Sequence, residues 1–447
     1  MIPRPCYDFP KLNESILLAK AKASFSAQMK DFEGAAEVRL DLLPDARVYV
    51  HVQVNNCDPW LGLDNIKSLA FDGKDIPGFG IKLGLSSAGG ARLKWCPNEE
   101  LLIGRGSQNT QITSLVFHLF NYRYIFGTRR SSEQDGTASY AIHHVDLKAH
   151  GWKVELKSLP ATSDIFKTLD EEGGYGLTHV GCLQKEDGAS FNGKTAQEML
   201  NALKHFLSFS KGMWCNPCLA VGFDENENMV WESWSSPKGG WYKPCSWFDP
   251  QHCEQLANLF PGFMARWQDE DWREALHEVI YWYLSSNISG RGIDNGIILS
   301  QAAIERLSFE YAVRQKRLVE AEGFKGLRAS DKFRLLFSSL GIPIDIPASM
   351  PEFQALAKQF NWIDAPHAIT EIRNSLVHPE HKRRGQFGKA FLPAWNLGQW
   401  YLELALLRIC EYSGTYSNRL IGEKWVGTVE PVPWNTEPRK EVAPAQP

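Results

Sequence analysis

The segment with the clearest chemical potential in this chain runs from Arg373 to His378 and reads Arg-Asn-Ser-Leu-Val-His. It brings a permanent cation, an amide and an imidazole close together along the chain. An arginine guanidinium can hold a phosphate through two parallel hydrogen bonds, and it stays charged at neutral pH. A histidine can accept or release a proton near neutral pH. These residue types could therefore act on a phosphodiester without a metal ion.

The spacing of these residues sets a condition on the helix that carries them. On an α-helix with about 100° per residue, Asn374 and His378 share a face, whereas Arg373 and His378 point about 140° apart. Arg373 and His378 can reach one phosphate only if the helix ends near His378 and the imidazole turns back. Pro379 favours such an ending, because a proline disfavours the α conformation of the residue before it. We therefore expect a helix that ends next to His378.

Residues 371–379, which read Glu-Ile-Arg-Asn-Ser-Leu-Val-His-Pro, resemble the R-x4-6-H signature of the HEPN superfamily. The resemblance extends over roughly residues 268–425 and implies an all-α HEPN-like helical bundle. It further implies a metal-independent endoribonuclease that uses the 2′-hydroxyl of RNA as nucleophile, with Arg373, Asn374 and His378 as catalytic residues. Two-part proteins of that family often resemble toxins or antiviral defence effectors, so the resemblance implies such a role here, regulated by the N-terminal region.

A single copy of the motif offers little apparatus for cleaving RNA. A catalyst must take the 2′-hydroxyl proton, stabilise a dianionic transition state and protonate the leaving oxygen. The resemblance implies that two copies face each other across a dimer axis and leave products with a 2′,3′-cyclic phosphate. We therefore expect a homodimer through the C-terminal bundle, RNA as substrate, and a trigger or regulatory partner at the N-terminal region.

Other charged residues could support this site. Glu305, on a preceding predicted helix, could orient Arg373 through an ion pair. Basic residues around the motif could guide an RNA backbone into the site, or they could form a solvated face: Arg314, Lys316, Arg317, Lys382, Arg383 and Arg384.

Two alternatives place the function elsewhere. In one, Arg373 pairs with an acid, His378 caps its helix, and the bundle is a non-catalytic dimerisation or ligand-binding module. In the other, the N-terminal region is an enzyme that stacks carbohydrate or nucleotide bases on its Trp side chains. The pair Cys215 and Cys218 has the spacing of half a zinc site, but no second pair follows at a matching distance, so we expect thiols. We predict no metal and no cofactor.

The C-terminal half of the chain shows the periodicity of helices. Apolar residues recur at a 3–4 spacing after Asp271, and further helices are predicted over residues 294–320, 330–340, 353–360, 366–377 and 393–412. The change of pattern near Pro261-Gly262 places a domain boundary at residue 262. The proline-rich residues 426–447 are expected to be poorly ordered.

Residues 1–262 read instead as a strand-rich α+β region, interpreted as a sensor or regulatory part of up to two subdomains. Arg47–Val54 alternates valines with polar residues, which is typical of a half-buried strand. Leu219–Phe223 and Met229–Trp234 flank a polar turn and predict a hairpin. Thr195 with Glu198 predicts the start of a helix, and residues 78–92 read as loop.

The bulk properties limit the classes of protein that fit. A chain of 447 residues can bury a full core without disulfides, and a net charge of −4 does not mark a globally basic nucleic-acid binder. The nine cysteines show no framework spacing, which fits reduced thiols. No long apolar run or signal-like start is found, so we expect a cytoplasmic protein.

Overall fold

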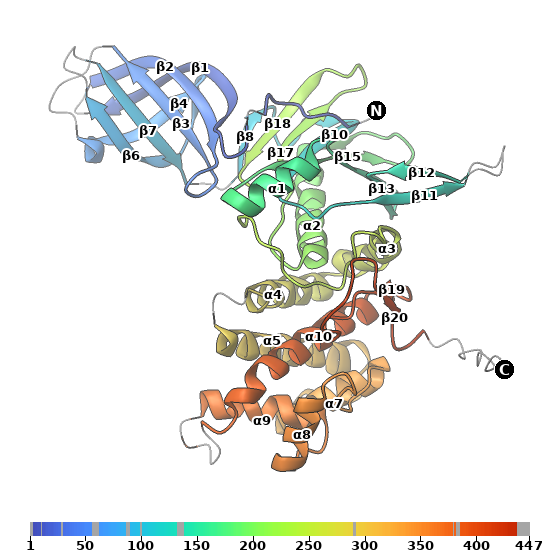
Figure 1. Cartoon of the computed structure of the whole chain (residues 1–447). Coiled ribbons are helices and arrows are strands. Elements are labelled where there is room, and N and C mark those ends of the chain that lie inside the picture. The colour runs from blue at the N-terminus through green and yellow to red at the C-terminus, as the bar shows by residue number, and fades with distance from the viewer. Residues whose placement is uncertain are drawn as a thin grey trace. The chain divides into compact units, whose positions relative to one another are not determined.

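The computed structural model describes residues 3–9, 11–27, 30–55, 62–85, 90–98, 101–131, 138–288, 292–378, 380 and 385–435, without the side chains of 85, 128–131 and 138–142 (Figure 1). The chain forms two compact units that alternate along the sequence. Unit 1 comprises Met1–Tyr124, Gly151–Leu203 and Cys215–Tyr242, and unit 2 comprises Ile125–His150, Lys204–Trp214 and Lys243–Pro447. The fold is α+β, with a strand-rich N-terminal half followed by a helical region, as the sequence predicts.

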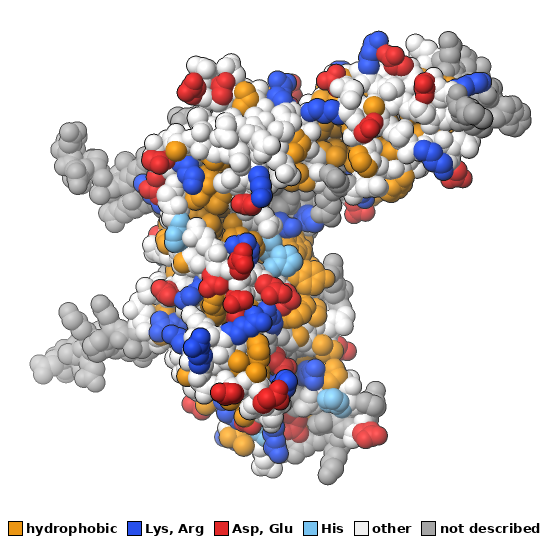
Figure 2. All heavy atoms as spheres, turned by 180° about the vertical axis from the view of Figure 1, so that it is seen from behind, with side chains coloured by type: hydrophobic (Ala, Val, Ile, Leu, Met, Phe, Trp, Pro, Cys, Tyr) orange, Lys and Arg blue, Asp and Glu red, His pale blue; other side chains and the backbone are white. Residues whose placement is uncertain are grey.

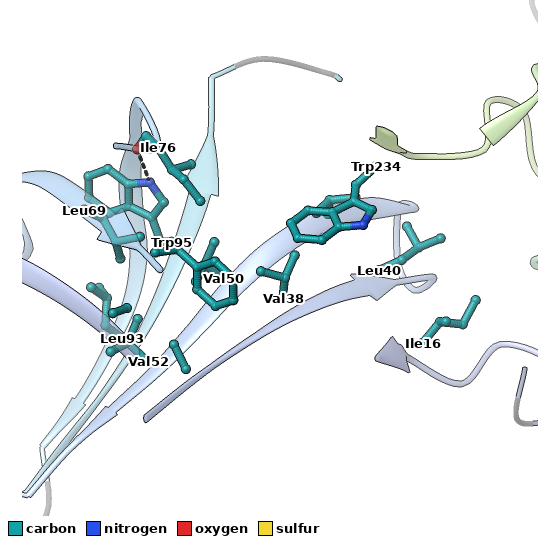
Figure 3. Close-up of a cluster of buried hydrophobic side chains, with 14 of the residues drawn as sticks. Ile16, Val38, Leu40, Val50, Val52, Leu69, Ile76, Leu93, Trp95 and Trp234 are labelled. Atoms are coloured by element: carbon teal, nitrogen blue, oxygen red, sulfur yellow. Dashed lines mark hydrogen bonds between the residues drawn. The ribbon is translucent and has the colours of Figure 1, made fainter. Parts of the chain in front are cut away.

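The first sheet of unit 1 is antiparallel and strongly curved, with the strand order β5-β4-β1-β2-β3-β7-β6. Its strands are β1 (Ile16–Ala27), β2 (Lys30–Asp41), β3 (Arg47–Val54), β4 (Ile66–Phe71), β5 (Lys74–Asp75), β6 (Gly78–Leu85) and β7 (Ala91–Pro97). Strand β3 confirms the predicted alternation, since Val48, Val50, Val52 and Val54 are all buried. These valines pack in one apolar core with Trp95, whose indole N–H donates to the carbonyl of Ile76 at 3.0 Å (Figure 3).

Strand β6 shows that the loop predicted over residues 78–92 is wrong for residues 78–85, while residues 86–89 lie outside the described residues. Gly78, Gly80 and Gly84 favoured a loop in the sequence, but β6 pairs with β7 along its whole length. Two of these glycines are required by packing: a Cβ on Gly78 would lie 2.3 Å from the carbonyl oxygen of Cys96, and one on Gly80 would lie 2.7 Å from Leu63. The glycines therefore permit close contacts of the strand instead of breaking it.

The strands that unit 1 contributes to the second sheet lie in the order β14-β15-β10-β17-β18-β8, with all neighbours antiparallel. These strands are β8 (Leu101–Arg105), β10 (Ser114–Phe120), β14 (Trp152–Ser158), β15 (Leu177–Lys185), β17 (Cys218–Phe223) and β18 (Met229–Ser235). The pairing of β17 with β18 confirms the predicted hairpin. Two short strands, β9 (Gln111–Ile112) and β16 (Phe191–Asn192), also pair, and helix α1 (Thr162–Glu172) precedes β15.

Helix α2 (Gly193–Lys211) confirms the predicted helix but not its predicted cap. The side chain of Asn192 accepts a hydrogen bond from the backbone N–H of Thr195 at 2.9 Å, so the cap lies before Thr195. A cap residue satisfies backbone N–H groups that have no partner inside the helix. Asn192 performs this function here, and Thr195 lies within the first turn.

Unit 2 is mainly a helical bundle. Its helices are α3 (Glu254–Gln268), α4 (Glu270–Ser286), α5 (Ile293–Phe309), the π-helical turn Glu310–Gln315, α6 (Ala321–Gly326), α7 (Ala329–Leu340), α8 (Pro351–Phe360), α9 (Ala365–Val377), the 3-10 turn Gly388–Ala390 and α10 (Phe391–Ile409). Helices α4, α7, α9 and α10 all pack against α5 or each other (Figure 1). The helix predicted over residues 294–320 is too long, because the α-helical pattern ends at Phe309 and the backbone of Arg317 is left-handed.

The domain boundary predicted at residue 262 falls inside α3. Pro261-Gly262 was interpreted as a break, but the helix runs through both residues. A Cβ on Gly262 would lie 1.8 Å from the carbonyl oxygen of Cys410, so the missing side chain lets α3 approach the end of α10. The glycine thus serves helix packing, which a sequence pattern cannot distinguish from a break.

Residues 426–435 do not form the poorly ordered tail that the sequence predicts. Strand β20 (Glu430–Pro431) pairs with β19 (Thr415–Tyr416), and Val432 is buried. The indole N–H of Trp434 donates to the carbonyl of Tyr412 at 2.6 Å. The prolines in this segment are compatible with such short pairing, and the remainder of the predicted tail lies outside the described residues.

A buried ion pair fixes the segment after α10 to the bundle. Arg419 donates to both carboxylate oxygens of Glu403, at 2.6 and 3.0 Å, and both side chains are almost fully buried. Tyr283 and Asn287 on the α4 side complete the network: the Tyr283 hydroxyl donates to Glu403, and Asn287 accepts from Arg419.

None of the helices in the described ranges combines the length and apolar character needed to cross a lipid bilayer.

Candidate functional site

Helix α9 carries the candidate catalytic residues and is fixed at its N-terminus by a capping interaction. The carboxylate of Asp364 accepts from the backbone N–H of His367 at 2.8 Å, and Pro366 lies in the first turn, where a proline is tolerated. Arg334 of α7 donates to both carboxylate oxygens of Asp364. Burial of Ile369 and Ile372 turns one face of α9 into the bundle, which leaves Arg373 and Asn374 half-buried.

The expected helix ending at His378 is confirmed. Helix α9 stops at Val377, and His378 has an extended backbone with φ −103° and ψ 111°, while its N–H still donates to the carbonyl of Asn374. The His378 side chain is exposed. The imidazole is therefore released from the helical direction that would separate it from Arg373 by about 140°.

The guanidinium of Arg373 contacts its own neighbour. Its Nη1 donates to the side-chain oxygen of Asn374 at 3.3 Å. No carboxylate within the described part of the chain forms an ion pair with Arg373. The pairing with an acid that the non-catalytic interpretation invoked is thus not seen there, and the guanidinium retains N–H groups for an anionic ligand.

The role predicted for Glu305 is wrong in this structure. Its carboxylate forms an ion pair with Lys332 of α7, and no hydrogen bond links it to Arg373 within the residues described. Glu305 therefore lies on the side of α5 that faces α7. On α9 itself, Nε2 of His367 lies 3.2 Å from the carboxylate of Glu371.

The basic residues after α5 do not lie beside Arg373 in one chain. Gln301, in the middle of α5, donates to the carbonyl of Ile369 in α9. Glu305, near the end of α5, and Asp364, at the start of α9, both pair with the same stretch of α7. Helices α5 and α9 are therefore antiparallel. His378, at the end of α9, is therefore level with the start of α5, whereas Arg314, Lys316 and Arg317 follow the end of α5. With a rise of 1.5 Å per residue, these basic residues lie roughly 30 Å from His378 along the helix axis.

Two of these basic residues also have partners of their own. Arg314 pairs with Glu310 at 3.2 Å and with Asp271 at 3.6 Å, and the amine of Lys316 lies 5.9 Å from the ring centre of Tyr311. Cations and acids are interleaved in the same way over the face shown in Figure 2. Lys382, Arg383 and Arg384 lie outside the described residues. Within one chain, Arg314, Lys316 and Arg317 therefore do not lie beside the motif, and their role in RNA binding stays a prediction.

Cys215 and Cys218 are both buried thiols. The thiol of Cys218 donates to the carbonyl of His118, and burial raises its pKa well above the ordinary value. No third His, Cys, Asp or Glu joins them in a metal-ligand arrangement among the residues that the structure describes. Both thiols are thus part of the protein core.

A second polar site, on the first sheet of unit 1, was missed by sequence reasoning. A groove of about 630 Å³ runs over the outer face of β2, β3, β6 and β7. It is lined by Ala35, Glu37, His51, Val52, Gln53, Lys82, Gly84, Arg92, Leu93 and Lys94. The polar positions of β3 were visible in the alternation of Arg47–Val54, but only the strand pairing brings Lys82 and Arg92 to the same place.

Comparisons with known proteins relate two parts of this chain to one kind of protein. The YopA central domain model matches residues 107–244, and the YopA C-terminal domain model matches residues 269–430. The SPbeta prophage-derived uncharacterized protein YopA of Bacillus subtilis (strain 168) is 33% identical over 294 residues. That alignment covers 65% of this chain and 66% of the relative, just under two thirds of its length. No solved structure matches.

These matches correct the expected HEPN resemblance. The region assigned to it, residues 268–425, falls almost wholly in the YopA C-terminal domain match, and no HEPN family is found. A pattern of one arginine and one histidine over six residues is short enough to recur at unrelated helix ends. The residues remain where the sequence placed them, but the family assignment is wrong.

Proposed function

We propose that the helical region of unit 2 is a metal-independent endoribonuclease that acts through Arg373, Asn374 and His378. The proposal rests on one observation: α9 ends directly before His378, which has an extended backbone and an exposed side chain. This is the condition under which residues five apart in the sequence can approach one phosphate. The proposal uses the residues and their geometry and does not depend on any family.

In the proposed reaction each residue has a separate role. Neutral His378 takes the proton of the 2′-hydroxyl, which attacks the adjacent phosphate. Arg373 holds the phosphate and stabilises the charge that develops in the transition state. Asn374 orients the guanidinium through the hydrogen bond at 3.3 Å. The bond to the 5′-oxygen breaks, and that oxygen receives a proton.

The proton for the leaving oxygen needs a second donor, which one exposed imidazole per chain cannot supply at the same time. A second copy related by a two-fold axis would provide another His378 and another Arg373. We therefore include a homodimer through the bundle in the proposal. Light scattering at micromolar concentration should give twice the chain mass of 50.5 kDa. An active monomer would contradict the shared site.

Cleavage of a labelled single-stranded RNA in excess EDTA tests the activity. His378→Ala and Arg373→Ala should abolish or strongly reduce cleavage, and products should end in a 2′,3′-cyclic phosphate. His150→Asn is the matched control, because His150 is also exposed and its φ of 49° is one that Asn tolerates.

Two outcomes would reject the proposal. One is cleavage of a substrate whose 2′-hydroxyls are replaced by hydrogen, because the proposed nucleophile is then missing. The other is activity that survives His378→Ala in protein with normal folding. In that case the bundle would be a non-catalytic module, and the function would lie in unit 1.

A further inference from the structure

The groove on the first sheet of unit 1 is built from two cross-strand rows of side chains. In the first row, Glu37 pairs in register with His51, His51 with Lys94, and Lys94 with Lys82. In the second row, Ala35 is opposite Gln53, Gln53 opposite Arg92, and Arg92 opposite Gly84. Side chains of alternate residues share a face of a sheet, so both rows point away from the valine core.

The charges in the groove are not balanced. Its lining holds the permanent cations Lys82, Arg92 and Lys94 and a single acid, Glu37. Glu37 already accepts hydrogen bonds from Lys20 at 2.9 Å and Arg39 at 2.7 Å, and these contacts lower its pKa. The groove is therefore locally cationic in a protein whose net charge is −4.

Lys94 is held in place by an acid on the same face of the sheet, outside the lining of the groove. It pairs with Asp41, which also accepts from the hydroxyl of Ser15 at 2.8 Å. Burial alone would raise the pKa of Asp41, but hydrogen bonds from His51, Lys94 and Ser15 outweigh it and keep the pKa well below its ordinary value. The amine of Lys94 also lies 3.8 Å from the ring centre of Tyr49. Lys94 thus contributes mainly to the shape of the groove.

Lys82 and Arg92 are the cations available to a ligand. Both are exposed, and neither forms an ion pair with another residue in the described part of the chain. They are diagonal neighbours on adjacent strands, about 7–8 Å apart, so they could contact successive phosphates of one strand. The space above them is open, because a Cβ built on Gly84 meets no atom within 4 Å.

The size and chemistry of the groove indicate the kind of ligand that it could hold. Its volume of about 630 Å³ is that of a site for a small molecule or for a few units of a single strand. The lining also offers the amide of Gln53 and the imidazole of His51. The Nε2 atom of His51 faces Asp41 at 3.4 Å, so Nδ1 is the nitrogen that can bind a hydroxyl or a base edge. Arginine matches phosphate geometry with two hydrogen bonds, and lysine adds a point charge.

We propose that this groove binds single-stranded RNA, with Arg92 and Lys82 on the backbone phosphates and Gln53 and His51 toward the sugar or base. Only the choice of RNA over DNA rests on the proposed ribonuclease function. The binding of a single phosphate backbone follows from the groove itself. The groove belongs to unit 1, and Arg373 and His378 belong to unit 2.

Fluorescence anisotropy of a labelled 12-nucleotide RNA tests this inference. The full-length His378→Ala variant is used as background, so that binding is measured without cleavage. Adding K82A and R92A should weaken binding at least tenfold. It should also reduce the slope of log affinity against log salt by about 1.4, since each phosphate contact to a single strand contributes about 0.7. K67A with K74A removes the same charge from exposed lysines on β4 and β5, and should leave binding unchanged.

The groove proposal is overturned if the K82A/R92A variant binds as tightly as its background, or if the K67A/K74A variant loses as much affinity. The charge reversals K82E and R92E should weaken binding further, and thermal unfolding should show that these exposed substitutions leave the fold intact. Equal affinity for DNA of the same sequence would overturn the restriction to RNA. Cleavage and binding are measured in different variants, so failure of the ribonuclease proposal is distinguishable from failure of the groove.

Discussion

His118 makes unit 1 sensitive to acid in a range where most carboxylates are still ionised. It lies on β10 and is fully buried. The backbone N–H of Cys6 donates to its Nε2 at 3.1 Å, so that nitrogen carries no proton, and Nδ1 donates to the carbonyl of Leu219 at 2.9 Å. Protonation at Nε2 would direct two N–H groups at each other. The folded unit therefore requires neutral His118.

The size of this effect follows from the pKa of His118. Burial lowers it from its ordinary value of 6.5 to about 4, while the backbone contacts of Leu219 and Cys218 act weakly in the other direction. Between these two values the unfolded chain binds the proton and the folded chain does not. The stabilisation is thus complete above pH 6.5 and is lost as the pH falls toward 4. At 1.36 kcal/mol per unit, the loss approaches about 3 kcal/mol.

Urea unfolding from pH 7.5 to 4.5 measures this loss, with hydrogen exchange of the β10 amides reporting on unit 1. His118→Asn should be less stable at pH 7.5, because it leaves the Cys6 N–H without its acceptor. Its free energy of unfolding should nevertheless fall much less between pH 6.5 and 4.5. His277→Gln replaces an exposed imidazole and should keep the full pH dependence. Parallel losses in the wild-type protein and His118→Asn would refute the reasoning.

Three further outcomes are expected. In cleavage assays, Arg373→Ala should cost about 2–4 kcal/mol of transition-state stabilisation. Arg373→Lys should recover little of the lost activity, because an amine lacks the bidentate geometry of the guanidinium. Arg419→Met should destabilise unit 2 by about 3–5 kcal/mol in urea unfolding, since Glu403 stays buried without its partner, and Glu403→Met in addition should restore most of this. Gly262→Ala should destabilise by about 1–3 kcal/mol, because its Cβ would collide with the Cys410 carbonyl.

Local patterns predicted those elements in which neighbouring residues determine the structure. The valines of Arg47–Val54 form a buried face because the strand period is two, and β3 has the predicted bounds. Helices α7, α8 and α9 begin and end within two residues of their predicted positions. The ending of α9 follows from Pro379, which acts on the residue directly before it.

Glycine and proline were misread where a distant segment determines their role. Gly78 and Gly80 accommodate β7 and Leu63, and Gly262 accommodates Cys410, which is far along the chain. A sequence shows which residues lack a Cβ, but it does not show which distant atom lies where that Cβ would be. The same limit explains the error at residues 294–320, where the helical periodicity continues past Phe309 into a π-helical turn.

The two candidate sites differ in how far the sequence could reveal them. Arg373 and His378 are only five residues apart, so their geometry depends on one helix end and could be predicted. Lys82 and Arg92 meet only through the register of β6 with β7, and Gln53 joins them only through the pairing of β3 with β7. The composition, with its net negative charge, therefore does not predict a cationic groove. The groove forms only because the strand order brings these residues together.

The error in the family assignment and the success of the helix-end prediction have the same cause. Both came from residues 371–379, and a segment that short contains enough information to specify a local backbone turn. It contains too little to identify a family, whereas the matches to the YopA domain models extend over many more residues. The chemistry at Arg373 and His378 must therefore be judged by cleavage in the absence of metal, and RNA binding by Lys82 and Arg92 must be judged separately. Either result would stand without the other, because the residues involved belong to different units of the chain.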